Sequence, residues 1–78
     1  MIMDIDVFIK NIANQFDETD ISAFNKETRY KDLTEWSSLI ALSIIAMIDE
    51  EYQVVLKGNE MKASVTIEDL YNIIISKL

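Results

Sequence analysis

The chain lacks both cysteine and histidine, and these two absences remove several kinds of chemistry. Without cysteine there is no disulfide framework and no thiolate nucleophile. Without histidine the chain has neither the usual general base nor the commonest metal ligand. No glycine-rich phosphate loop and no recognisable pair of catalytic carboxylates replaces them. We therefore expect a protein that is not an enzyme.

Proline is also absent, and Gly58 is the only glycine among the 78 residues. An all-β fold needs many turn residues, so this scarcity argues against one. Half of the residues are hydrophobic, which disfavours disorder. The length suits one domain, and we expect residues 1–78 to form a single helical unit.

Basic residues are few: seven, against fourteen acidic ones, give a formal net charge of −7. Such a surface repels nucleic acid and anionic membranes and attracts basic protein partners. No run reaches the roughly 18 apolar residues of a membrane span, and the acidic start of the chain is unlike a signal peptide. We expect a cytoplasmic monomer that binds neither nucleic acid nor membrane.

Four segments carry the signals of helices. Apolar residues three and four apart predict a helix over residues 4–16. An almost wholly apolar run predicts a second over residues 38–52, and a short third is expected near residues 59–63. The fourth begins after Thr66, which with Asp69 resembles a capping box. The expected fold class is all-α, a small four-helix bundle with three long helices and one short one.

A long connection, residues 17–37, joins the first two of these helices. Its apolar residues should pin it to the bundle: Ile21, Phe24, Tyr30 and Leu33. The acidic residues at its start resemble a weak cation site, but the glycine and the bidentate glutamate of a calcium loop are missing. A solvated acidic loop is the better interpretation.

The second helix is apolar on every side, because Ser43 is its only polar residue between Leu39 and Ile48. In so small a protein it cannot be wrapped completely, so a second apolar side must be exposed. The residues expected to face inward are Leu39, Leu42, Ile45 and Ile48. Those expected to form an outward stripe are Ile40, Ser43 and Met47.

Two polar groups bracket this helix. Ser37 and Ser38 stand at its start, where a serine often caps the helix and contributes about 1 kcal/mol. Asp49, Glu50 and Glu51 occupy its last turn, where the macrodipole disfavours each negative charge by roughly 0.3–1 kcal/mol. Local stability does not explain these acids, whereas binding to a basic partner does.

Four short motifs, in their order and spacing, resemble those of the acyl carrier proteins. They are Tyr30-Lys31-Asp32-Leu33, Trp36-Ser37-Ser38-Leu39, Ile48-Asp49-Glu50-Glu51-Tyr52 and Val65-Thr66-Ile67-Glu68-Asp69-Leu70. That family shows an aromatic-x-Asp-Leu element, an Asp-Ser-Leu motif, a helix that ends in acids before an aromatic residue, and a similar entry to its last helix. The resemblance covers essentially the whole chain.

The resemblance implies that Ser38 carries 4′-phosphopantetheine, transferred from coenzyme A by a carrier-protein synthase (a phosphopantetheinyl transferase). The thiol of this arm would hold an acyl or aminoacyl group as a thioester. A loading ligase would supply the group, and acyl-transferring enzymes with basic docking surfaces would receive it. The residues implied to bind these partners are Leu39, Ile40, Met47, Asp49, Glu50 and Glu51.

Two departures from the family pattern concern the same helix. The family's aspartate before the modified serine is Ser37 here, and Ile40 and Ser43 stand where fatty-acid carriers present acids. These changes indicate a dedicated partner enzyme rather than general fatty-acid synthesis. The alternative is an unmodified acidic helical adaptor that binds a basic partner through this helix, with Ser38 only as a cap.

Overall fold

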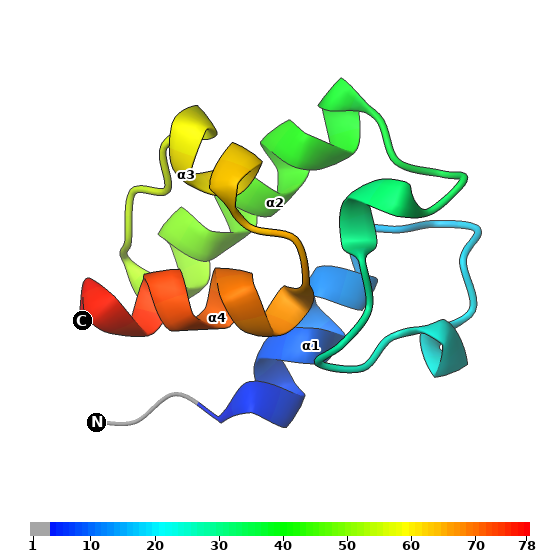
Figure 1. The fold of residues 1–78 in the computed structure, drawn as a ribbon, viewed down its shortest axis with the longest axis horizontal. Coiled ribbons are helices and arrows are strands. Elements are labelled where there is room, and N and C mark those ends of the chain that lie inside the picture. The colour runs from blue at the N-terminus through cyan, green and yellow to red at the C-terminus, as the bar shows by residue number, and fades with distance from the viewer. Residues whose placement is uncertain (1–3) are drawn as a thin grey trace.

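The computed structural model describes residues 4–78, and this range is all-helical without a strand (Figure 1). The helices are α1 (Ile5–Ala13), α2 (Ser38–Tyr52), α3 (Gly58–Ala63) and α4 (Ile67–Ser76). Two single turns of 3₁₀ helix, η1 (Ile21–Ala23) and η2 (Tyr30–Asp32), lie in the connection between α1 and α2. The prediction of an all-α fold with three longer helices and one short helix, the third along the chain, is confirmed.

Helix α1 is shorter than its hydrophobic pattern predicts. Asp4 caps its start by accepting from the Asp6 backbone N at 2.9 Å. After Ala13 the chain tightens, because the Phe16 backbone N donates to the Ala13 carbonyl, three residues back, at 3.0 Å. Phe16 nevertheless remains buried. The apolar spacing therefore located the buried residues correctly but not the end of the helix.

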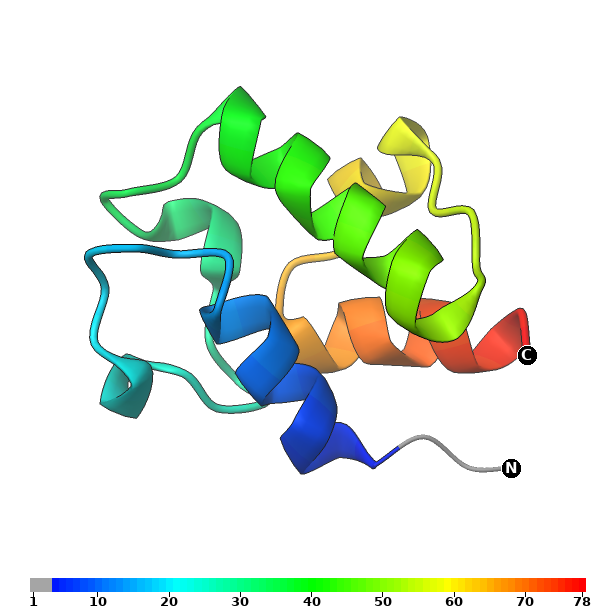
Figure 2. The ribbon, with the colours of Figure 1, turned by 180° about the vertical axis from the view of Figure 1, so that it is seen from behind.

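The core forms where α1, α2 and α4 meet. The fully buried residues of these helices are Phe8, Ile12, Ile44, Ile48, Ile67, Leu70 and Ile74. Helices α1 and α4 pack against each other, and Figure 2 shows α1 and α2 in front of α4. Leu78 fits the helical spacing of Leu70 and Ile74 but is 60% exposed, because α4 ends at Ser76.

The connection between α1 and α2 is tied to the start of α4. The Lys26 carbonyl accepts from the Glu68 backbone N at 2.9 Å, and the Thr28 carbonyl accepts from the Ile67 backbone N at 3.1 Å. These bonds satisfy N–H groups that a helix start leaves without an intrahelical partner. Phe24 and Tyr30 are buried as predicted and Leu33 is half-buried.

One expected anchor of this connection is wrong: the Ile21 side chain is 56% exposed. It lies in η1, where Asp20 caps the turn by accepting from the Ser22 backbone N at 2.8 Å. The turn is thus held by its own polar cap. The buried contact next to it comes from Phe24, whose ring centroid lies 5.1 Å from that of Phe16.

Candidate functional site

Helix α2 begins at two serines with different roles. Ser37 is the N-cap, and its Oγ accepts from the Ile40 backbone N at 3.3 Å. Ser38 is the first helical residue and is exposed. Within residues 4–78 no group hydrogen-bonds its hydroxyl. Of the two serines at the helix start, Ser37 is thus the cap, and the adaptor alternative is wrong in giving this role to Ser38. Ser38 is exposed.

The outer side of α2 is exposed along its whole length. We call these residues the docking face: Leu39, Leu42, Ala46, Asp49 and Glu50. Leu39 is 75% exposed and Leu42 is 63% exposed, so the end next to Ser38 is apolar. The far end is acidic. In Figure 2, α2 passes in front of α4 and no other element covers its outer side.

The predicted orientation of α2 is wrong in part. Leu39 and Leu42 were expected in the core but are exposed, whereas Met47 was expected outside and is only 9% exposed. Ile40 is half-buried against the core. Ile48 is fully buried, as expected. Met47 therefore exposes little surface, whereas Leu42 lies on the outer side of α2.

Asp49, Glu50 and Glu51 are exposed at the end of α2. None of them forms an ion pair with a residue in the range 4–78, and the last turn contains no basic residue. The helix ends at Gln53, whose N–H donates to the Asp49 carbonyl at 2.9 Å and whose left-handed backbone (φ 57°) turns the chain away. The negative end of the helix dipole and three carboxylates thus coincide without a neutralising cation.

A groove of about 500 Å³ lies between α2 and α3, within the usual size range of small-ligand sites. Its lining residues are Lys31, Trp36, Ala41, Ile45, Gly58, Asn59, Met61 and Lys62. Ala41 and Ile45 stand three and seven residues after Ser38, so all three share one side of the helix. Ser38 thus lies on the groove side of α2, one turn before the first α2 residue of the lining.

The α3 wall of this groove is held from η2. Lys31 Nζ donates to the carbonyls of Met61 and Lys62, both at 3.0 Å, and a cation is favourable at this helix end. The Tyr30 hydroxyl forms a short hydrogen bond with Ser64, whose hydroxyl donates to the Met61 carbonyl at 2.7 Å. Burial is the main cause that raises the pKa of Tyr30. The α3 wall of the groove is thus tied by polar contacts to residues some thirty positions earlier in the chain.

Aromatic rings support the segment that leads into Ser38. The Trp36 ring centroid lies 5.4 Å from that of Tyr30 and 6.4 Å from that of Phe16. Trp36 is half-buried and also lines the groove. These rings join the end of α1 to the start of α2, so Ser38 is presented by a packed segment.

Glu35, three residues before Ser38, ties this segment to the turn after α1. Its carboxylate accepts from the Asp17 backbone N at 2.7 Å, the Glu18 backbone N at 3.0 Å and the Thr19 hydroxyl at 2.7 Å. These bonds lower the pKa of Glu35 below its usual value of 4.5, and the bond from the Thr19 hydroxyl has the largest effect. Glu35 is therefore a structural acceptor rather than part of an acidic docking surface.

The Glu35→Gln variant is expected to be less stable than the native chain at neutral pH. Its free energy of unfolding should also change less than that of the native chain as the pH falls. A carboxylate with a lowered folded pKa stabilises the fold above its unfolded pKa, and this contribution is lost as the pH falls through the folded pKa. The difference in urea midpoint between variant and native chain should be largest at pH 7 and shrink below about pH 4.5.

Glu27→Gln is the matched control, because Glu27 is exposed and its carboxylate accepts no hydrogen bond in residues 4–78. Its urea midpoint should follow that of the native chain at every pH. A constant difference between Glu35→Gln and the native chain from pH 7 to pH 3.5 would show that the charge of Glu35 is not what holds the turn.

Sequence reasoning missed three features of the site: the exposure of Leu42, the contacts of Lys31 and the contacts of Glu35. Only the exposure of Leu42 had a signal in the sequence. Asp49 stands seven residues after Leu42 and eleven after Ser38, so these residues share one side of a helix. Counting back from the acids would have placed Leu42 outside. The contacts of Lys31 and Glu35 join distant segments and leave no local pattern in the sequence.

Within residues 4–78 no helix has the length and apolarity needed to cross a membrane. The same range holds no group of three metal-ligating residues placed to bind an ion. Comparison of the chain with family models, curated proteins and solved structures finds no match. Its resemblance to the acyl carrier proteins stays a prediction.

Proposed function

We propose that this protein is a carrier that holds acyl or aminoacyl groups as thioesters on a 4′-phosphopantetheine arm attached to Ser38, within a bundle like that of the acyl carrier proteins. The observation that carries the proposal is the exposed, partner-free Ser38 hydroxyl at the start of a 15-residue helix, with a groove along the same side. The cargo would be delivered to enzymes that contact α2.

The residues at the start of α2 suit a phosphodiester. A helix start places backbone N–H groups and the positive end of the dipole near an anion. Ser38 Oγ would bond to the phosphorus that bears pantetheine, while the pyrophosphate bond of coenzyme A breaks and adenosine 3′,5′-bisphosphate leaves. The hydroxyl proton would pass to a base on the synthase. The arm supplies the thiol that this cysteine-free chain lacks.

The docking face suits a partner with an apolar recess and a basic rim. Exposed Leu39 and Leu42 lie next to Ser38, and Asp49 and Glu50 lie two to three turns further along. A partner bound here would reach the attachment site directly. Apolar contact would supply affinity, and the acids would orient the partner and speed its approach.

The Ser38→Ala variant is expected to gain no mass when incubated with coenzyme A, Mg²⁺ and a broad-specificity carrier-protein synthase. The native chain should gain the mass of one phosphopantetheine, because Ser38 offers the accessible hydroxyl. Intact-mass spectrometry measures both. Ser37→Ala is the control: it should still be modified, and it should lose roughly 1 kcal/mol of stability with the cap.

A mass gain that survives Ser38→Ala would reject the assigned site, and no gain in the native chain would reject the carrier proposal. The second candidate would then be an unmodified adaptor. It is supported by the same docking face, since two exposed leucines beside unpaired acids can bind a partner without any arm.

A further inference from the structure

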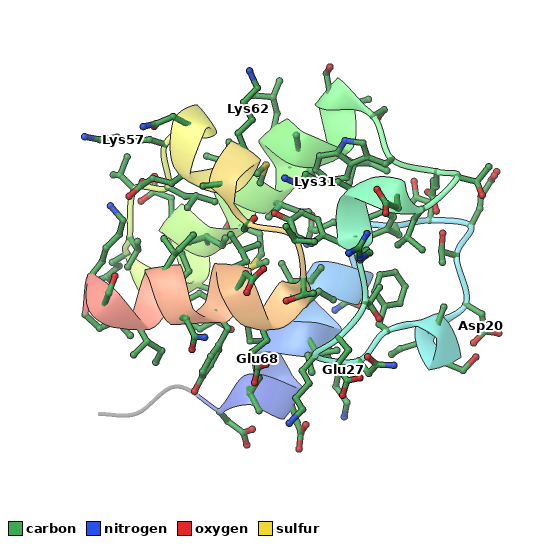
Figure 3. All side chains as sticks on the ribbon, in the orientation of Figure 1. Asp20, Glu27, Lys31, Lys57, Lys62 and Glu68 are labelled. Carbon is green, nitrogen blue, oxygen red and sulfur yellow. The ribbon has the colours of Figure 1, made fainter. Side chains whose placement is uncertain are left out.

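The groove between α2 and α3 differs in charge from the rest of the molecule. Acidic residues outnumber basic ones by fourteen to seven over the chain, yet the groove lining includes Lys31 and Lys62 and no acidic residue. Figure 3 shows both lysines, together with Lys57, on the α3 side, whereas the acids that it labels lie elsewhere. The charged side chains that line the groove are therefore basic, although the net charge of the protein is negative.

Neither lysine of the groove forms an ion pair with a carboxylate in residues 4–78, and the carboxylate whose pKa Lys31 helps to lower, that of Asp69, lies outside the groove lining. Lys31 is half-buried and uses two of its three N–H donors on backbone carbonyls, so one donor remains. Lys62 is exposed. A partly buried ammonium with an unused donor favours an anionic ligand.

The remaining lining is mostly apolar. Trp36, Ala41, Ile45 and Met61 supply most of it, and they offer a surface to a hydrocarbon or aromatic body. An apolar group attached to Ser38 enters from the α2 side and runs toward α3. The lysines lie on η2 and α3, on the opposite wall.

We propose that the groove accepts, from the arm on Ser38, an acyl group with an apolar body and a carboxylate at its far end. This proposal rests on the carrier function proposed above. The body lies between Trp36, Ile45 and Met61, and the carboxylate pairs with Lys31 and Lys62. A group with an ammonium at its far end is disfavoured, because that ammonium would lie beside two cations with no acidic side chain in the lining to pair with it.

The test attaches cargo without any synthase. The chain has no cysteine, so Ser38→Cys creates a single thiol. This thiol is alkylated with an iodoacetamide linker of pantetheine length that ends in an octanoyl, suberoyl or 8-aminooctanoyl amide. The three cargoes match in length and differ in whether the far end is neutral, anionic or cationic.

The suberoyl form is expected to melt about 2–5 °C above the octanoyl form, and the aminooctanoyl form below both. High salt should reduce the suberoyl advantage, because the ion pair is partly exposed. Lys31→Met and Lys62→Met should each shrink it. Comparing the cargoes within one variant cancels any general loss of stability. Lys57→Met is the control, because Lys57 does not line the groove, and it should preserve the order.

Equal melting temperatures for the suberoyl and octanoyl forms, or the highest value for the aminooctanoyl form, would overturn the proposal. A suberoyl advantage that survives in both lysine variants would do the same. Because the linker is attached chemically, these outcomes do not depend on whether a synthase modifies Ser38. Failure of the cargo proposal and failure of the carrier proposal are thus distinguishable.

Discussion

The Leu42→Asn variant is expected to accept the phosphopantetheine arm at least about tenfold more slowly than the native chain, while folding with nearly the same stability. Leu42 is 63% exposed, so its loss removes no core contact. A leucine that becomes buried in a partner contributes roughly 1.5–3 kcal/mol, and about 1.4 kcal/mol is a factor of ten. The measurement is kcat/KM for the synthase, followed by intact mass, with urea midpoints alongside. Asparagine keeps the net charge, so the approach of a basic partner is unchanged.

Val55→Asn is the matched control for this prediction. Val55 is 68% exposed and lies between α2 and α3, outside the docking face. It should be modified at the native rate. Equal slowing of both variants, or a native rate for Leu42→Asn, would show that the synthase does not bind the docking face. The synthase would then reach Ser38 from another direction.

The Phe8→Ala variant is expected to lose about 3–5 kcal/mol of stability, which is a large share of what so small a domain possesses. Phe8 is fully buried. Its ring centroid lies 5.8 Å from that of Tyr52 at the end of α2 and 5.7 Å from that of Tyr71 in α4. One side chain of α1 thus contacts the other two long helices. Thermal and urea unfolding followed by circular dichroism measure the loss.

Val7→Ala tests the same helix without the core contact, because Val7 is 50% exposed. Its stability should stay within roughly 0.5 kcal/mol of the native chain. A loss below about 1 kcal/mol for Phe8→Ala would mean that the junction of the three helices is not the main source of stability.

Local rules predicted the helices well where the end signals are themselves local. The start of α4 follows from a capping box that the structure confirms: the Asp69 backbone N donates to Thr66 Oγ1, and the Thr66 backbone N donates to Asp69 Oδ2, both at 3.1 Å. The bounds of α2 also agree with prediction, because Ser37 caps its start. The end of α1 was not predicted. Phe16 fits the helical spacing and is buried, but it lies in the turn that follows the helix.

The sequence indicated which residues form the candidate site, but not which residues surround them. The sequence singled out Ser38 and the three acids, and the structure exposes all of them. It could not give the rotation of α2, since a helix that is apolar on every side buries whichever side its neighbours cover. Nor could it give the groove, whose second wall is α3 and whose cation comes from η2. Such features depend on packing between distant segments.

The short helix α3 has a weaker attachment than the other helices. Met61 is its one buried residue. Its other ties are polar: Lys31 at its last carbonyls, and a 2.8 Å ion pair between Glu60 and Lys77. Segments with little buried apolar surface open at low free-energy cost while the core stays intact. The α3 wall can therefore move while the α2 wall stays packed in the core, so the groove can widen around a bound group without unfolding of the bundle.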